Sequence, residues 1–427
     1  MVFNLIRLFL LLVVFCILYP VFRNRSIYYF LRFSGPSFIK LGQILSVRPD
    51  LVGDNLAKTL SSFQDSLPAF SEKEVQKVLN SEYVDFTKIF AEFDFKAISA
   101  ASIAQVHKAM TFDGKRVAVK ILRPRIDKIV LRDIGSLKII IKIIGVFSKF
   151  LAKSLSDIAL LLEELAKSEL DLLQEAANAS KLKEDLRNVK GFYVPEIFWK
   201  FSTKKVLVLE FIDGISFSNQ KAISESQFDK KKIAENFVVS YFTQVYGNGF
   251  FHADMHPGNL FLMKNGDVAV VDFGIMGMID KKTRIAVAEI LIGFLNKDYK
   301  KVAQIHIEAG LVPKDVNVDS LSLSCRKIGE TIVGANVRDI SLASLLENLI
   351  TMTRDYKMVT KPELLLLQKT LLLVEGVGVA LDKDLNIWQI AKPWVKEWAK
   401  NNIGFDAKIR DALVDLFGLV KGLLRSN

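Results

Sequence analysis

The sequence lacks the glycine-rich loops with which most kinases and NTPases bind phosphate. Neither G-x-G-x-x-G nor G-x-x-x-x-G-K-[ST] occurs among its 427 residues, which excludes an ordinary kinase glycine loop and a Walker-A loop. Cysteine is scarce as well: Cys16 and Cys325 lie far apart, so we expect no disulfide framework, and a reducing compartment fits. Zinc-finger and RNP patterns are missing, and we expect no nucleic-acid partner.

Acidic residues are outnumbered by basic ones, and the formal net charge is +11. Half of the residues are hydrophobic, which is enough to bury two lobes and more. The basic balance alone would also suit nucleic acid. Beside an apolar N-terminus it fits an anionic lipid surface at least as well, because juxtamembrane lysines and arginines are attracted to such lipids.

The chain begins with an apolar segment of borderline length. Leu8 to Phe22 is an uncharged run of 15 residues, shorter than the roughly 20 that a spanning helix needs. Arg23 and Arg25 follow it, as expected for a cytoplasmic flank, and no small-residue cleavage site indicates a removed signal peptide. We expect either a single anchor or an interfacial helix. The alternative is a hydrophobic helix buried by the large lobe.

Residues 252–274, HADMHPGNLFLMKNGDVAVVDFG, carry two carboxylates and an asparagine at a spacing typical of phosphoryl-transfer enzymes. Such enzymes position Mg²⁺, neutralise phosphate oxygens and aim the acceptor hydroxyl. We expect Asp254 to accept or orient the acceptor proton. Asn259 would ligate one Mg²⁺ through its amide oxygen, and Asp272 would bridge the metal to the phosphates.

The residues around this motif suggest how it is built. Val268 to Val271 reads as a buried strand, and Asn265-Gly266 before it marks a tight hairpin turn. Histidines four apart on a helix can bind zinc, and His252 and His256 have this spacing. Pro257 disfavours a helical His256, so we favour structural hydrogen bonding that braces the loop.

A kinase-type site also needs a lysine for the phosphates, and Val117-Ala118-Val119-Lys120 supplies one. Asp113-Gly114 is a hairpin turn signal, and the alternation from Arg116 to Ile121 predicts a strand that ends with Lys120 in a cleft.

An acid must hold this lysine. Ser154 to Leu186 is a run of helix formers that contains Glu169, Asp171 and Glu175, the last two on one helical face. We expect Glu175 to pair with Lys120. The alternative is that these acids form a solvated helix face.

Small residues stand where kinases have glycines. The segment just ahead of the Lys120 strand consists of Ile98, Ser99, Ala100, Ala101, Ser102, Ile103, Ala104, Gln105 and Val106. Alanine and serine allow the backbone to approach phosphate but restrict φ more than glycine does, so we expect a stiffer nucleotide-binding loop. Read alone, the segment is also compatible with an ordinary small-residue turn.

These motifs resemble the UbiB/ADCK family of atypical kinase-like proteins of ubiquinone (coenzyme Q) biosynthesis, most closely its bacterial UbiB members. The family has an alanine-rich loop, and an E-x-D motif matched by Glu169 and Asp171 ahead of the helix-C glutamate, Glu175. Its N-terminal K-x-G-Q motif is matched by Lys40-Leu41-Gly42-Gln43. The stretch 364–394 also resembles the bacterial UbiB large lobe.

The resemblance covers roughly residues 25 to 410. It implies an α+β, atypical protein-kinase-like fold of two lobes with an N-terminal helical extension. We expect a membrane segment at 1–24, the extension with K-x-G-Q at 25–95, the small lobe at 96–210 and a mostly helical large lobe at 211–427. The strand Val206 to Glu210 would lead into the hinge. No A-P-E follows Gly274, and a helix from Lys281 to Leu295 is expected instead.

In the family, the K-x-G-Q segment packs over the active site, with its lysine directed at the phosphates and the E-x-D acids. The resemblance therefore implies a catalytic role for Lys40, beside Lys120, Glu175 and Asp254, and nucleotide contacts for Glu169, Asp171 and the small-residue loop. Lys40 alone would equally suit the surface. The implied cofactors are ATP and Mg²⁺, and we do not expect protein substrates.

The implied activity is ATP hydrolysis, or phosphorylation of a small or lipidic substrate, in support of ubiquinone biosynthesis. Expected partners are membrane lipid, prenylated phenol or quinone precursors and other ubiquinone-biosynthesis proteins, with the catalytic domain on the cytoplasmic side of the bacterial inner membrane. After Trp398 only an amphipathic stretch, Ala407 to Leu424, stands where some UbiB members carry paired membrane helices, so the N-terminal segment is expected to take over that role.

Two other functions stay open. One is a nucleotide-gated scaffold of a quinone-enzyme assembly, in which turnover is incidental. The other is a small-molecule kinase of the aminoglycoside or choline type, which shares H-x-D-x-x-x-x-N but would not explain K-x-G-Q and E-x-D. Retention of Asp254 favours turnover, because a mere binder could lose it without losing affinity.

Overall fold

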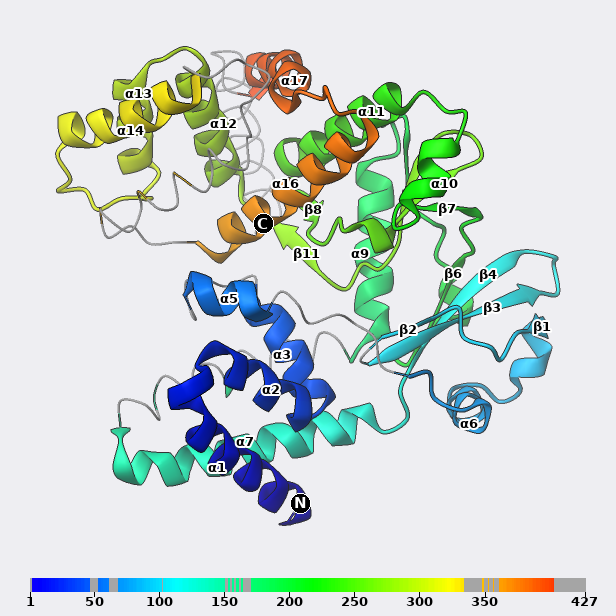
Figure 1. The fold of residues 1–427 in the computed structure, drawn as a ribbon. Helices are drawn as coiled ribbons and strands as arrows, with labels where there is room; N and C mark the ends of the chain where they lie inside the picture. Colours follow the sequence, from blue (N-terminus) through cyan, green and yellow to red (C-terminus); the bar gives the residue numbers. More distant parts are fainter. Residues whose placement is uncertain are drawn as a thin grey trace, which may run out of the picture. The chain divides into compact units, whose positions relative to one another are not determined.

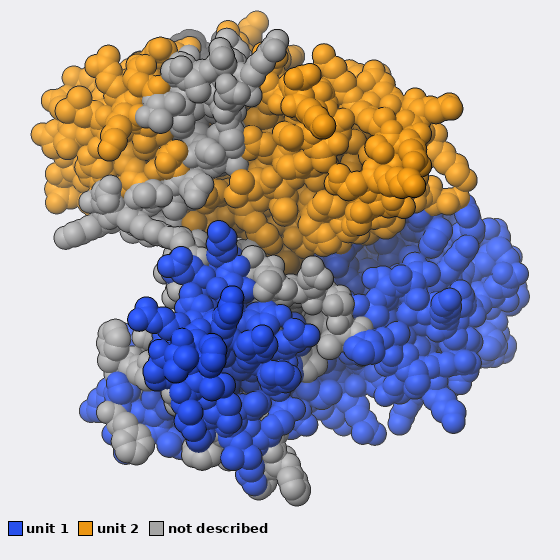
Figure 2. All heavy atoms as spheres, viewed as in Figure 1, with its two compact units in different colours: residues 1–181, 195–212, 272–274 blue, residues 182–194, 213–271, 275–427 orange. Residues whose placement is uncertain are grey.

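The computed structural model describes residues 2–46, 53–60, 68–101, 103–149, 170–333 and 361–402, with isolated positions at 153, 156, 159, 160, 163, 348, 352 and 356. The chain divides into two units, coloured blue and orange in Figure 2. Unit 1 comprises residues 1–181, 195–212 and 272–274, and unit 2 comprises residues 182–194, 213–271 and 275–427. The Asp-Phe-Gly tripeptide at 272–274 therefore belongs to the unit that contains Lys120.

Unit 1 combines an antiparallel sheet with helices (Figure 1). The helices are α1 (Val2–Phe22), α2 (Asn24–Ser34), α3 (Pro36–Ser46), α5 (Asp54–Leu60), α6 (Glu72–Glu82), α7 (Ile126–Phe147) and the start of α9 (Leu172–Asp185). The strands are β1 (Phe90–Phe93), β2 (Ser99–Ala100), β3 (Ala104–Thr111), β4 (Arg116–Leu122) and β6 (Val206–Glu210).

The sheet has the order β1-β3-β4-β6, with β2 paired to β3, and every pairing is antiparallel. Gly114 has φ +78° in the β3–β4 turn, a conformation that favours glycine, as the Asp-Gly signal predicted. Val75 and Leu79 of α6 pack on Val119 and its neighbours in the sheet core. Strand β1, although it falls in the range expected for the helical extension, is thus part of this sheet.

The N-terminal helices pack on one another within unit 1. Helix α1 contacts α2 and α7, and the Arg7 guanidinium donates to the Ser34 carbonyl at the end of α2. The opposite side of α1 is open: Leu10 is 58% exposed and Ile17 68%. The partners of this apolar helix among the described residues are therefore helices of its own unit, and much of its surface faces outward.

Helix α9 begins later than the sequence suggested, which corrects the expected helix from Ser154 to Leu186. Leu170 is a turn residue, Asp171 is not helical, and the helix starts at Leu172. The Asp171 carboxylate accepts the Leu173 N–H at 3.1 Å, as an N-cap side chain does, because the first-turn amides of a helix have no partner within it. Asp171 and Glu175 consequently do not share a helical face.

Unit 2 is mostly helical. Its helices are α10 (Gln220–Glu225), α11 (Lys230–Phe242), the π-helical turn η3 (Thr243–Asn248), the 3₁₀ turn η4 (Pro257–Asn259), α12 (Lys281–Leu295), α13 (Tyr299–Glu308), α14 (Val318–Val333), α16 (Pro362–Leu381) and α17 (Ile387–Asn402). Its strands are β5 (Phe192–Tyr193), β7 (Gly214–Ser216), β8 (Phe250–His252), β9 (Leu260–Met263), β10 (Val268–Val270) and β11 (Met276–Met278).

Two small sheets, β5-β10-β9-β7 and β11-β8, carry the motif of residues 252–274. The β9–β10 turn contains Gly266 at φ +86°, and the fully buried strand β10 leads toward Asp272, both as predicted. Helix α12 has the predicted bounds, with the short strand β11 before it.

Helix α16 runs beside α11 in the core of unit 2 (Figure 1). Among the described residues it is the one helix long and apolar enough to cross a bilayer by length and composition. Its Leu365, Leu371 and Val374 are buried, and the hydroxyl of buried Tyr241 donates to its Leu367 carbonyl. Its apolar character therefore has an explanation in core packing.

Candidate functional site

Lys120 and Glu175 form a close ion pair within unit 1. The Lys120 ammonium on β4 donates to both Glu175 carboxylate oxygens, at 2.7 and 2.8 Å, so the partner predicted from the sequence is the observed one. The same ammonium donates to Asp272 Oδ1 at 3.1 Å. One positive charge is thus shared by two carboxylates that lie 55 and 152 residues away along the chain.

Burial and charge shift the protonation of this cluster. Burial acts to lower the pKa of the Lys120 ammonium, but the Asp272 and Glu175 carboxylates outweigh it and hold that pKa above its ordinary value. Burial raises the pKa of the Glu175 carboxyl to about 7; the Lys120 ammonium opposes this shift, and the negative charge of Asp272 adds to it. The lysine therefore stays charged at neutral pH.

Helix α9 fixes the Asp-Phe-Gly tripeptide from both sides. Phe273 is fully buried; its N–H donates to Glu175 Oε1 at 3.2 Å, and its carbonyl accepts from Asn178 Nδ2 at 3.0 Å. Glu175 and Asn178 lie three apart on α9, hence on one face. Glu175 thus orients both Lys120 and the backbone next to Asp272. Asn178 was not singled out from the sequence.

Asp272 combines an unusual backbone conformation with a partly exposed carboxylate. Its φ is +65°, in the left-handed region that non-glycine residues enter at a cost, and the Gly274 N–H donates to its Oδ1. Its side chain is 49% exposed, in contrast to Glu175 at 8%. A partly exposed carboxylate beside a fixed ammonium fits the chemistry of a metal–phosphate ligand.

The expected nucleotide loop spans β2 and the start of β3. Ile98, Ser99, Ala100, Ala101, Ile103 and Val106 are exposed or half-buried, whereas Ala104 is buried and Ser102 lies outside the described residues. Gln105 is 1% exposed, and its amide accepts the Phe70 N–H and contacts His107 Nε2 at 2.8 Å. The Gln105 side chain therefore anchors residue 70 to the sheet.

Three other candidates from the sequence remain in unit 1, and the side chain of only one of them, Asp171, is described. Asp171 caps α9, and its Oδ2 lies 3.9 Å from Lys204 Nζ. Glu169 lies outside the described residues. Lys40 is placed within α3, but its side chain is likewise not described.

Unit 2 carries the other two candidates. Asn259 Nδ2 donates to the Asp254 carbonyl at 3.0 Å and lies 3.5 Å from Asp254 Oδ2. With its nitrogen committed in this way, the amide oxygen of Asn259 is the atom left for a cation, and amide oxygen is a ligand that Mg²⁺ accepts.

Both histidines brace the Asp254 loop, as favoured from the sequence. Buried His252 accepts the Asp254 N–H at its Nδ1, and His256 accepts the Gly258 N–H at 2.9 Å. His252 belongs to strand β8 and His256 caps a 3₁₀ turn, so they do not share a helix. The described residues contain no cluster of three or more His, Cys, Asp or Glu side chains suited to a metal. Mg²⁺ bound with ATP does not require one, because phosphates and waters fill most of its coordination shell.

Two residues of α16 contact this loop and were missed from the sequence. Lys369 Nζ lies 3.4 Å from Asp254 Oδ1, and the Thr370 hydroxyl donates to the Ala253 carbonyl at 3.1 Å. They lie 115 and 117 residues from their partners, and no local pattern marks them.

Comparisons with known proteins identify the family of the chain. The model of the ABC1 atypical kinase-like domain matches residues 62–306, and that of the UbiB helical domain matches residues 325–386. "Probable protein kinase UbiB" of Cellvibrio japonicus is 38% identical over 374 residues, which cover 86% of this chain and 68% of that protein. The protein of the same name from Marinobacter nauticus is 37% identical over 379 residues, which cover 87% of this chain and 69% of that protein.

A solved structure, the complex of Rv3197 with erythromycin from Mycobacterium tuberculosis, shares the fold with a TM-score of 0.54. It is 22% identical and covers 82% of this chain and 90% of that chain, and it supports the α+β kinase-like fold expected from the sequence. The matched domains, the identity to UbiB proteins over most of the chain and this fold agree, and the chain belongs to the ABC1/UbiB family of atypical kinase-like proteins.

Proposed function

We propose that this protein binds Mg²⁺-ATP and hydrolyses it, or transfers its terminal phosphoryl group to a small or lipidic acceptor, in support of ubiquinone biosynthesis. The observation that carries the proposal is the Lys120 ammonium held between Glu175 and Asp272. A permanently charged lysine with one buried and one partly exposed carboxylate is the arrangement that phosphoryl transfer needs for positioning and charge neutralisation.

Each residue has a proposed task. Lys120 neutralises phosphate oxygens, and Glu175 keeps it in place. The oxygens of Asp272 and Asn259 would hold Mg²⁺, which when bound offsets the charge on the phosphates. Asp254 orients the attacking hydroxyl or water and accepts its proton. Lys40 is proposed as a further phosphate contact on the family resemblance alone.

The decisive experiment removes the carboxylate of Asp254 but keeps its shape. Asp254→Asn should retain Mg²⁺-ATP binding by calorimetry and abolish phosphate release, because the proton acceptor is lost. Bacteria that carry the variant should lose ubiquinone and accumulate an early prenylated phenol precursor. Asp315→Asn, an exposed aspartate on the same unit, is the matched control and should behave as wild type.

Wild-type ubiquinone levels from an Asp254→Asn protein that cannot hydrolyse ATP would contradict the enzymatic proposal. That result would favour the nucleotide-gated scaffold. Hydrolysis by Asp254→Asn at the wild-type rate would instead remove Asp254 from the reaction.

We further propose that the N-terminal helices of unit 1 contact the cytoplasmic face of the inner membrane. Exposed apolar residues cover the C-terminal half of α1, among them Ile17 at 68%, Val21 at 74% and Phe22 at 52% exposure. Exposed Arg23 and Arg25 follow directly. An apolar helix surface that ends in aromatic residues and arginines is typical of a segment lying in the lipid interface.

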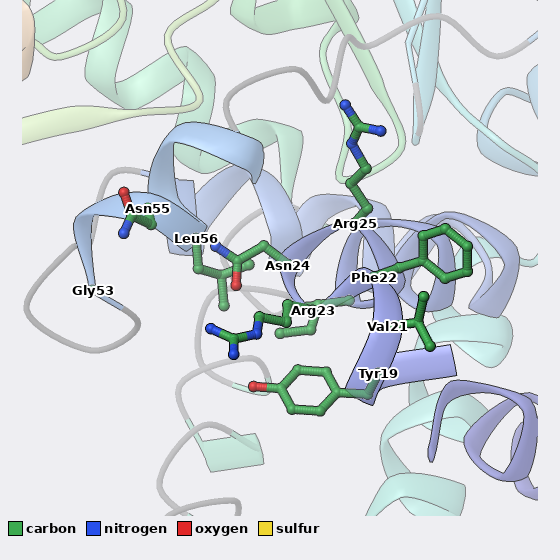
Figure 3. Close-up of a pocket in the computed structure, with 10 residues that line it drawn as sticks. Tyr19, Val21, Phe22, Arg23, Asn24, Arg25, Gly53, Asn55 and Leu56 are labelled. Carbon is green, nitrogen blue, oxygen red and sulfur yellow. The ribbon is translucent and has the colours of Figure 1, made fainter. Parts of the chain in front are cut away.

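A cavity of about 710 Å³ lies where α1 passes into α2, next to the start of α5. Figure 3 shows Arg23 extending beside Tyr19 toward the space near Asn24 and Leu56, and Arg25 also lines the cavity. The arginine and asparagine side chains that line this cavity suit a phospholipid phosphate at the membrane surface on which α1 would lie.

Vesicle sedimentation tests the membrane contact. Full-length protein should bind anionic vesicles, and Ile17→Asp combined with Val21→Asp should reduce binding strongly, because two exposed apolar side chains become charged. Leu323→Asp, on the 67% exposed Leu323 of α14, is the matched control. Equal binding by all three proteins would leave only the basic surface responsible, and binding would then fall steeply with salt.

A further inference from the structure

Helix α16 places two consecutive side chains on the loop that carries Asp254. Lys369 Nζ lies 3.4 Å from Asp254 Oδ1, and Thr370 Oγ1 donates to the Ala253 carbonyl at 3.1 Å. All of these residues lie within unit 2. The helical region outside the kinase-like domain match thus meets the candidate catalytic loop at its central residue.

The two oxygens of Asp254 have different partners. Oδ2 lies 3.5 Å from Asn259 Nδ2 and 3.8 Å from His256 Nε2. Oδ1 faces Lys369. Among the described residues Lys369 is the one lysine or arginine in an ion pair with this carboxylate. Each oxygen of the carboxylate therefore has polar neighbours of its own.

The helix that presents Lys369 is itself held firmly. The hydroxyl of Thr370 is fully buried between the Ala253 carbonyl and the Leu366 carbonyl of its own helix. The Tyr241 hydroxyl binds the Leu367 carbonyl one turn earlier. Since the side chains of Lys369 and Asp254 are 34% and 25% exposed, the pair is fixed by a rigid element yet open to a small reactant.

We infer that Lys369 is a positioning residue for the proposed phosphoryl transfer: its ammonium holds the Asp254 carboxylate in the orientation in which it receives the proton of the nucleophile. The inference rests on the proposed role of Asp254. A nearby cation does not make a carboxylate more basic, so the benefit lies in orientation, which is the main resource in phosphoryl transfer. The helical domain then supplies a residue that the proposed reaction requires.

The test compares steady-state ATP hydrolysis by full-length wild type, Lys369→Met and Lys369→Arg in the presence of Mg²⁺. Lys369→Met should lower kcat by about 10- to 100-fold, the effect of a misplaced reacting group, with KM for ATP within about twofold. Lys369→Arg restores a cation and should recover most of kcat. Lys383→Met, an exposed lysine just after α16, is the matched control and should not change kcat.

Melting temperature separates positioning from folding. A partly exposed ion pair contributes little to stability, so Lys369→Met should melt within about 4 °C of wild type. A large drop in melting temperature that Lys369→Arg does not repair would make Lys369 a structural residue and overturn the inference.

Two kinetic outcomes would also overturn it. An unchanged kcat in Lys369→Met would show that Asp254 needs no help from α16, while leaving the proposed ATP turnover intact. A raised KM with an unchanged kcat would make Lys369 a nucleotide contact. Absence of ATP turnover in wild type would refute the proposed function itself, and the role of Lys369 with it.

Discussion

Replacement of Lys120 by methionine would leave Glu175 without its principal charge partner in a buried position. Glu175 is buried, and both of its oxygens accept from Lys120. Removing one member of a buried ion pair destabilises a protein by about 3–5 kcal/mol, because the other charge is left uncompensated. We expect Lys120→Met to lower the local stability of β4 and α9 by about 3 kcal/mol near pH 8.

The effect should depend on pH in a defined direction. The pKa of the Glu175 carboxyl is raised from 4.5 to about 7, so the folded protein holds this proton more tightly than the unfolded chain does. Such a group contributes stability below its unfolded pKa, and this contribution is lost as pH rises toward the folded value. Without Lys120 that pKa rises further and the loss continues to higher pH. Lys120→Met should therefore destabilise more near pH 8 than near pH 5.

Hydrogen–deuterium exchange of peptides from β4 and α9 measures this directly in the full-length protein. A loss of about 3 kcal/mol corresponds to roughly 100-fold faster exchange. Glu175→Gln should cost less, because Lys120 keeps Asp272 at 3.1 Å. Lys120→Met combined with Glu175→Gln should be more stable than Lys120→Met alone, since no buried charge is then unpaired. Additive losses in the double variant would refute this account of the pair.

Three further predictions concern separate parts of the molecule. Asp272→Asn should weaken Mg²⁺-ATP binding at least about tenfold in calorimetry, because the metal loses a charged ligand, and unchanged affinity would remove Asp272 from the metal site. Gly277→Ala should destabilise by about 1–3 kcal/mol, since the new Cβ would lie 2.1 Å from the Phe251 ring. Gly376→Ala in α16, where nothing lies within 4 Å, should be neutral or stabilising, and melting temperatures in the reverse order would contradict this packing. Burial lowers the pKa of His107, so its contribution to stability is retained above about pH 6.5 and falls below that pH. The urea midpoint of wild type should therefore drop on acidification more than that of His107→Gln. Equal drops would show that His107 is not the cause.

The features predicted correctly from the sequence are those whose signals are local. The β3–β4 and β9–β10 turns follow from Asp-Gly and Asn-Gly, because glycine at positive φ is what these turns require. The bounds of β6 and α12 follow from apolar patterning over adjacent residues. The Lys120–Glu175 pair was accessible because both residues stand in recognisable motifs.

The features missed depend on tertiary contacts or on a competing local bond. Asp171 looked helical from composition, but its carboxylate accepts a first-turn amide of α9, and the helix begins only after it, at Leu172. Gln105 stands in an expected nucleotide loop, yet its period in β3 turns it into the core. Lys369 meets Asp254 from 115 residues away, a distance over which periodicity carries no information.

The bond from Thr370 to Ala253 has a consequence for how this chain can be divided. A shortened protein that covers the kinase-like match, residues 62–306, would keep Lys120, Glu175, Asp254, Asn259 and Asp272. It would also strip the Ala253 carbonyl and the Tyr241 hydroxyl of their partners and uncover the apolar surface on which α16 packs. The boundary between the segments that match the two family models is therefore a boundary of sequence similarity and not of autonomous folding. Thr370 in the helical segment thus holds a loop encoded more than 100 residues earlier.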